Sequence, residues 1–188
     1  MSNGSVQAAR ALAESLLARS APRRWAHVCG VAKRAGELGG GGEEETDVLV
    51  CAAWLHDVGY SDKVRLTGFH PLDGALLLRS LGWSMRLCAL VANHSAAAVE
   101  ARFFGCSEQL ALFPDERTLT RDLLWYCDMT VGPDGSPLTF GERMADVRSR
   151  YSNDDYVSQA LDATMDERSG AVARACAWVR LVEEENQV

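Results

Sequence analysis

Apolar residues recur at helical spacing along most of this chain, and this pattern constrains its fold more than any other feature. Trp25, Val28, Ala32 and Ala35 follow one another at three- and four-residue steps, which is the spacing of one face of an α-helix. No segment alternates between apolar and polar residues for long enough to require a β-sheet. Alanine and leucine dominate the hydrophobic residues, which make up 47% of the chain, and both favour helices. We therefore expect an all-α fold, an irregular multi-helix bundle of roughly eight to ten helices.

Breaks in the pattern divide the chain into expected helices. Four consecutive glycines, residues 39–42, precede a strongly apolar helix that begins near Glu44. That helix should end at His56 and Asp57, because Gly59 is a natural helix terminator. The other helices are expected at residues 6–19, 22–38, 71–81, 83–92, 95–104, 120–129, 140–151 and 155–185.

The chain length of 188 residues fits a single domain, 1–188. We expect its core at about residues 23–150, with an N-terminal helix, 5–20, and a C-terminal helix, 155–185, packing on it. No segment resembles a signal peptide or reaches the roughly 18 apolar residues of a membrane span. The six cysteines form no Cys-x-x-Cys pair, so we interpret them as reduced, buried residues, with a disulfide framework as the alternative. These features predict a cytoplasmic protein.

The formal net charge of −7 argues against a polyanionic partner, so we expect neither nucleic acid nor a membrane. A small phosphorylated substrate remains compatible with this charge, because a metal and a few arginines reverse its sign locally. A homodimer is left open.

All four histidines fall into one spaced pattern: His27, then His56 followed directly by Asp57, then His70 and His94, with Asp128 further on. Any one of these histidines, taken alone, is more simply a hydrogen-bonded core residue. Together, imidazole nitrogens and carboxylate oxygens suit divalent ions such as iron, manganese, nickel or zinc. Neighbours on a helix point about 100° apart, but this restriction loosens in a last turn, where unpaired carbonyls also favour a cation. There the two oxygens of Asp57 are placed to bridge two ions.

The order of these residues and the segment 54–59, Trp-Leu-His-Asp-Val-Gly, resemble the HD-domain metal-dependent phosphohydrolases, an all-helical superfamily, in its six-ligand form. The resemblance spans about residues 23–150. It implies that a first ion is held by His27, His56, Asp57 and Asp128, and that Asp57 bridges to a second ion held by His70 and His94. It further implies one or two divalent ions, with iron or manganese first and nickel, cobalt, zinc or magnesium as alternatives, and a metal-activated hydroxide that attacks phosphorus.

The resemblance also suggests groups that contact the substrate. Arg24 lies three residues before His27, on the same helix face, and resembles the family's phosphate contact, with Arg23 as the fallback. Tyr60 stands where the HD-GYP branch, the cyclic-dinucleotide phosphodiesterases, carries a lysine, which argues against that branch. Lys63 or Arg65 in the same loop are alternative phosphate contacts. The catalytic candidates are therefore Asp57, Arg24 and Lys63.

Other polar and aromatic residues have simpler interpretations. We expect Asp73 to cap or pair within its helix, and three arginines to form a solvated, salt-bridged face: Arg143, Arg148 and Arg150. The tryptophans are expected in the core, with Trp125 and Tyr126 as an alternative wall for a base.

We therefore predict a metal-dependent phosphohydrolase that acts on a small, nucleotide-like phosphorylated substrate. One alternative is a di-iron oxygenase, which would use the same six ligands. Another is a metal-bearing ligand-binding domain without catalysis, although a complete ligand set argues against it.

Overall fold

The computed structural model describes residues 5–185, which are 70% helical and contain no strands. The expected all-α fold is confirmed. The helices and single turns follow one another as α1 (Val6–Leu17), α2 (Pro22–Leu38), α3 (Glu43–Leu55), η1 (Val58–Tyr60), α4 (His70–Ser80), α5 (Met85–Ala92), η2 (His94–Ala96), α6 (Ala97–Phe103), α7 (Ser107–Leu110), α8 (Leu119–Asp128), α9 (Phe140–Arg148) and α10 (Tyr156–Glu185).

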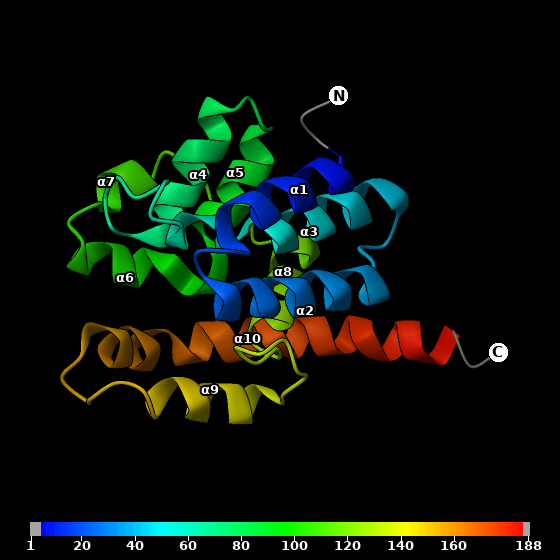
Figure 1. The fold of residues 1–188 in the computed structure, drawn as a ribbon. Helices are drawn as coiled ribbons and strands as arrows, with labels where there is room; N and C mark the ends of the chain where they lie inside the picture. Colours follow the sequence, from blue (N-terminus) through cyan, green and yellow to red (C-terminus); the bar gives the residue numbers. More distant parts are fainter. Residues whose placement is uncertain (1–4, 186–188) are drawn as a thin grey trace.

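Helix α3 lies at the centre of the bundle. It packs against α1 and α2 on one side and contacts α5 and α8 on the other. The long α10 runs along the opposite edge of the molecule, against α8, and α9 lies on its outer side (Figure 1). Helix α8 is thereby held between α2 and α3 on one side and α10 on the other.

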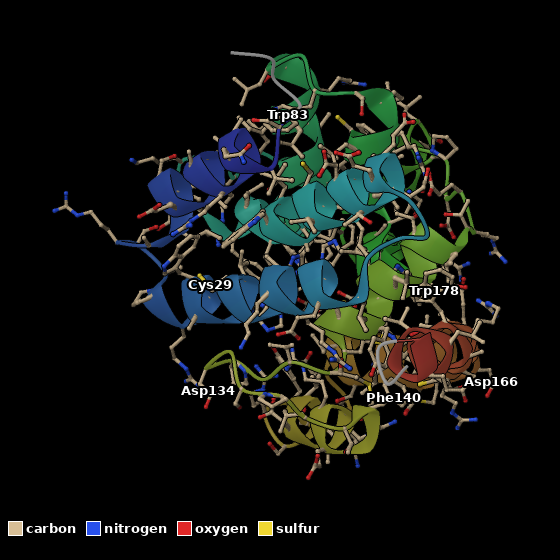
Figure 2. The ribbon with its side chains drawn as sticks, turned by 90° about the vertical axis from the view of Figure 1, so that its right-hand side faces the viewer. Cys29, Trp83, Asp134, Phe140, Asp166 and Trp178 are labelled. Atoms are coloured by element: carbon tan, nitrogen blue, oxygen red, sulfur yellow. The ribbon has the colours of Figure 1, made fainter. Side chains whose placement is uncertain are left out.

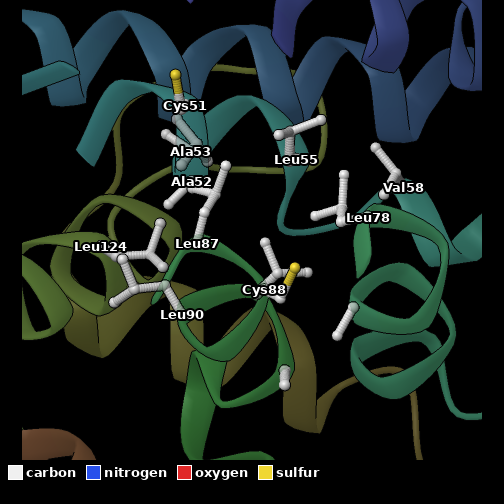
Figure 3. Packing of buried hydrophobic residues seen from close by; sticks show 14 of the residues in the cluster. Cys51, Ala52, Ala53, Leu55, Val58, Leu78, Leu87, Cys88, Leu90 and Leu124 are labelled. Atoms are coloured by element: carbon white, nitrogen blue, oxygen red, sulfur yellow. The ribbon is translucent and has the colours of Figure 1, made fainter. Parts of the chain in front are cut away.

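The core is built around small side chains on α3. Ala52 and Ala53 are fully buried and let α5 approach closely, while Leu55 lies beside Val58 of η1 and Leu78 of α4 (Figure 3). Burying a leucine side chain stabilises a fold by about 1.5–3 kcal/mol, so the apolar run before His56 anchors the end of α3. A second, smaller cluster joins α8 to α9 and α10 through Trp125, Met144, Leu161 and Val172, among others.

The helix starts follow from capping residues. Thr118 accepts a hydrogen bond from the Arg121 backbone nitrogen at 3.4 Å and begins α8. Thr139 and Glu142 form a reciprocal capping box at the start of α9. The expected helix 95–104 starts only at Ala97, because Ser95 and Ala96 adopt left-handed backbone angles with φ of 53° and 58°.

None of the six cysteines, which all lie within residues 5–185, forms a disulfide; four are buried and Cys29 and Cys176 are half-buried. Within residues 5–185, no helix combines the length and the apolar character that crossing a bilayer requires. Residues 1–4 and 186–188 lie outside the described range, so the single-domain prediction for 1–188 stays a prediction.

Candidate metal centre

The end of α3 brings His56 and Asp57 into contact. His56 keeps helical backbone angles, with φ of −56° and ψ of −36°, whereas Asp57 leaves the helix with φ of −104° and ψ of 8°. This change lets adjacent side chains converge, and His56 Nε2 lies 3.3 Å from Asp57 Oδ2. Both residues are buried. The helix ends one residue earlier than expected, at Leu55.

The two oxygens of Asp57 face two different pairs of histidines. Oδ2 lies 3.3 Å from His56 Nε2 and 3.9 Å from His27 Nε2. Oδ1 lies 3.5 Å from His70 Nε2 and 3.7 Å from His94 Nε2. Two groups able to bind a metal therefore share one carboxylate, and the ligand atoms within each group lie within 4.8 Å of one another.

Asp128, at the last residue of α8, adds a second carboxylate to the first of these groups. Its Oδ1 lies 3.0 Å from His27 Nε2 and 3.9 Å from His56 Nε2. The structure thus brings together all six side chains that the sequence pattern selected, from five separate segments of the chain. Their role as ligands is a proposal that we develop below.

Backbone carbonyls fix the orientation of three of the imidazole rings. The Nδ1 atoms of His27, His56 and His94 lie 3.1, 2.8 and 2.6 Å from the carbonyl oxygens of Gly132, Ala53 and Val91, respectively. A carbonyl only accepts, so Nδ1 carries a proton in each ring, and each Nε2 is left facing the carboxylates. His56 Nε2 is buried and has no hydrogen-bond partner among the described residues. A buried ring nitrogen without such a partner, beside two carboxylates, fits a ligand of a divalent cation.

The charges around Asp57 agree with such a cation. Burial by itself would raise the pKa of the Asp57 carboxyl, but Arg24 and His56 outweigh it and hold this pKa well below its usual range. The pKa of Asp128 is lowered in the same way, chiefly by His27. Burial holds the pKa of His70 well below its usual value. Charged carboxylates and a neutral imidazole are the protonation states that metal binding requires.

Arg24 lies directly beside the centre, as expected. Its Nη1 donates to Asp57 Oδ2 at 2.7 Å. Its guanidinium carbon lies 4.0 Å from the centre of the Tyr60 ring, and that ring stacks on His70 at 3.9 Å. Tyr60 therefore keeps both His70, a candidate ligand, and Arg24, the candidate phosphate contact, in position. The sequence did not predict this role.

Two residues at the site were missed or misjudged from the sequence. Ser95 Oγ donates to Asp128 Oδ2. The left-handed backbone conformation of Ser95 costs of order 1–3 kcal/mol of stability, and no residue type in the sequence predicts it. Arg143 was expected on a solvated face, which is wrong: it is buried, with Nη2 4.0 Å from Asp128 Oδ1. The fold of α9 against α8 turns this side chain inward. Arg148 is exposed and pairs with Asp162, as expected of a salt-bridged face.

An inner cavity of about 180 Å³ opens over four of the six side chains, Asp57, His70, His94 and Asp128, and its wall also includes Arg24, Tyr60, Glu100 and Arg143. An outer cavity of about 460 Å³ adjoins it beside the start of α2, with Arg23 in its wall. Lys63 and Arg65 are exposed and line neither cavity. The structure therefore does not support Lys63 as a catalytic residue.

The remaining expectations concern structural residues. Asp73 was expected to cap or pair within its own helix, but it accepts hydrogen bonds from Thr67 and Gly68 in the loop before α4. Trp125 is buried and donates through Nε1 to the Asn93 carbonyl oxygen at 3.1 Å. Tyr126 accepts from Arg34, and neither aromatic residue lines the two cavities at the centre. The loop 131–138 packs along α2 with Asp134 at its exposed tip (Figure 2), which brings the Gly132 carbonyl to His27.

The family model of the HD domain matches residues 24–146. The chain belongs to the HD domain family. The matched range contains all six candidate ligands as well as Arg24 and Arg143, and α10 lies beyond it. No curated protein and no solved structure matches the chain significantly.

Proposed function

We propose that this HD domain is a metal-dependent phosphohydrolase that acts on a small phosphorylated substrate. The observation that carries the proposal is the position of Asp57, whose two oxygens each face a separate pair of histidine Nε2 atoms at 3.3–3.9 Å. Arg24 pairs with Oδ2 of this buried carboxylate, and a cation held among the histidines would also compensate its charge at Oδ1. Membership of the HD domain family supports the same class of activity.

In this proposal the first ion is held by His27, His56, Asp57 and Asp128, and a second by Asp57, His70 and His94. Iron or manganese suits this mixture of nitrogen and oxygen ligands best, with nickel, cobalt, zinc and magnesium as alternatives. An ion bound there would lower the pKa of a coordinated water towards neutrality and would stabilise negative charge on a phosphoryl oxygen.

The protein's own residues orient the substrate. Arg24 presents a planar guanidinium beside the centre, 2.7 Å from Asp57, and guanidinium groups match the oxygens of a phosphoryl group bidentately. The stack of Arg24, Tyr60 and His70 holds that guanidinium in place. We therefore assign Arg24 to phosphate binding in the proposed reaction, and Asp57 to bridging the two groups.

The cleft supports a small, nucleotide-like molecule as the substrate. Tyr151 and Tyr156 line the inner cavity together with Phe104, and aromatic faces of this kind stack on flat rings. The net charge of −7 disfavours a nucleic acid, because its phosphates would be repelled away from the arginines.

A di-iron oxygenase is the competing function, because the shared carboxylate serves an iron pair equally well. Turnover under strict anaerobic conditions separates the two reactions: hydrolysis continues without oxygen, whereas an oxygenase stops.

Metal analysis and turnover of an aryl phosphate test the proposal. The protein, loaded anaerobically with iron(II) or manganese(II), should contain about two ions per chain and hydrolyse the ester. His56→Ala should release metal and reduce turnover more than about 100-fold, since losing mere outer partners of a ligand already costs about 10–100-fold. His94→Ala should cost one of the two ions and leave the fold intact by circular dichroism.

Asp134→Asn is the control, because this carboxylate is exposed on the loop 131–138 and is a member of neither metal-binding group. Unchanged turnover in His56→Ala would remove the catalytic model, and a wild type that never takes more than one ion would remove the two-ion version.

A further inference from the structure

Four side chains form a rim between the inner and outer cavities, because they line both of them: Arg24, Tyr60, Arg143 and Arg150. The inner cavity, at about 180 Å³, is smaller than the roughly 300–1,000 Å³ of ordinary small-molecule sites. It is too small to hold the whole of a nucleotide-like molecule. A substrate of that size whose reacting group lies at the candidate ligands therefore extends beyond this cavity, and the outer cavity, at about 460 Å³, adjoins it at the rim.

The rim carries excess positive charge in a fixed position. Arg143 Nη1 and Arg150 Nη2 share a single carboxylate oxygen, Asp146 Oδ2, at 3.1 and 3.0 Å. Arg150 Nε also donates to the Asp146 backbone carbonyl at 3.2 Å. Arg143 Nη2 also lies 4.0 Å from Asp128 Oδ1, but the proposed first ion would take up that carboxylate. The two guanidinium groups that share the Asp146 carboxylate then leave a net charge of about +1. No described residue accepts a hydrogen bond from Arg150 Nη1, and Arg150 is exposed and lines both cavities, so this donor is free to bind a ligand there.

The other Arg–carboxylate pair in the wall of the inner cavity offers no such excess. Glu100 is paired with Arg168, whose Nη2 lies 3.4 Å from Glu100 Oε1 and whose Nε donates to Thr164. This pair is neutral as a whole, and the same wall includes Tyr151 and Tyr156. An additional anionic group is therefore attracted to Arg143 and Arg150 and not to this pair.

We propose that the substrate carries a second anionic group, a phosphate or a carboxylate, which Arg150 and Arg143 bind at the rim while the reacting phosphoryl group lies at the six candidate ligands. This inference rests on the proposed function and narrows its substrate class to phosphorylated molecules with two anionic ends. Arg150 is the specificity residue, since Arg143 also approaches Asp128 and serves both positions.

Three non-hydrolysable probes with matched three-carbon backbones test it: propylphosphonate, 3-phosphonopropionate and propane-1,3-bisphosphonate. Their affinities for the metal-loaded protein are measured by anaerobic calorimetry. In the wild type, the bisphosphonate should bind about tenfold or more tightly than propylphosphonate, as expected for charge-assisted hydrogen bonds. Arg150→Gln should abolish most of this advantage and leave the affinity for propylphosphonate nearly unchanged.

Arg148→Gln is the matched control. Arg148 is the last residue of α9, two positions before Arg150, and it is exposed, but it pairs with Asp162 and lines neither cavity. It should keep the full advantage. The proposal is overturned if the wild type shows no advantage, if Arg150→Gln keeps it, or if both variants lose it equally. The affinity of 3-phosphonopropionate reports whether a carboxylate serves as the second group.

The same three proteins are assayed with the aryl phosphate, which has one anionic group. If all three proteins hydrolyse the ester but bind the bisphosphonate and propylphosphonate equally well, the second-anion proposal is contradicted and the phosphohydrolase proposal is supported. If Arg150→Gln loses the bisphosphonate advantage but no protein hydrolyses the ester, the anion site is supported and the proposed reaction is contradicted.

Discussion

At the scale of single residues, Asp57 and Gly59 show how one tight turn determines the geometry of the candidate metal centre. Asp57 uses both carboxylate oxygens, one towards each pair of histidines. Gly59 was expected to terminate the helix, but α3 has already ended at Leu55. Its actual role is steric: a Cβ atom built on Gly59 would lie 1.9 Å from the His70 carbonyl oxygen and 2.9 Å from the Gly74 nitrogen. Glycine is needed here because η1 presses against the first turn of α4.

Gly59→Ala tests this steric role. The methyl group must push η1 away from α4, because both obstructing atoms belong to the backbone, so we expect a loss of about 3 kcal/mol in the free energy of unfolding. Urea denaturation measures it, and metal content should fall because His70 moves. Gly141→Ala on α9 is the control: its Cβ would meet no atom within 4 Å, so stability should rise by about 0.5–1 kcal/mol. Equal stabilities of the two variants would contradict the steric account.

At the scale of elements, the first turn of α4 orders the loop that precedes it. Asp73 accepts hydrogen bonds from the Thr67 nitrogen and hydroxyl, both at 2.8 Å, and from the Gly68 nitrogen at 3.1 Å. A carboxylate at this end of a helix also meets the positive end of its dipole. The loop therefore enters α4 in a fixed direction, and this direction places His70, the first residue of the helix, against Asp57.

Asp73→Ala should leave two backbone donors of this loop without their acceptor. Hydrogen bonds to charged groups contribute about 1.5–3 kcal/mol, so we expect the free energy of unfolding to fall by about 2 kcal/mol. Hydrogen exchange of the Thr67 and Gly68 amides should accelerate as well. Asp62→Ala, an exposed carboxylate of the same loop, should change neither quantity; a similar loss in both variants would show that the loop responds to charge alone.

At the scale of the whole molecule, one ion-pair network ties three segments that are distant in sequence. Arg86 on α5 donates to both carboxylate oxygens of Glu45 on α3, each at 2.7 Å, and to Glu116 before α8 at 2.8 Å. Thr120 on α8 also donates to Glu45. The network lies at the far end of α3 from His56 and Asp57, so it fixes the tilt of the helix that carries them.

The network predicts how stability depends on pH. The hydrogen bonds from Arg86 and Thr120 lower the pKa of Glu45 from its usual 4.5 to about 2. A carboxyl whose pKa is depressed by folding stabilises the protein above its unfolded value, and this contribution is lost as the pH falls from about 4.5 towards 2. In urea denaturation, the advantage of the wild type over Glu45→Gln should therefore be full at pH 7 and shrink below pH 4.5. Glu44→Gln, exposed on the same turn, should follow the wild type at every pH; a constant gap for Glu45→Gln would refute the linkage.

The sequence by itself determined the helices and the identity of the six converging side chains. Helical periodicity is a local property, and residues such as Thr118 and the glycines at 39–42 mark where helices begin and stop. The histidine pattern was informative because a buried set of imidazoles and carboxylates has few uses other than holding a cation. These features require no knowledge of how the helices pack.

Only the tertiary structure decided which neighbours surround those six groups. Arg143 faces Asp128 because α9 packs inward, Ser95 reaches Asp128 through a left-handed backbone, and Lys63 stays in solvent because its loop turns away. Each of these outcomes depends on contacts between segments far apart in the chain, and neither periodicity nor residue type encodes them. The substrate-binding rim at Arg150 is a property of the same kind, since two cavities meet there only after α2 and α9 have come together.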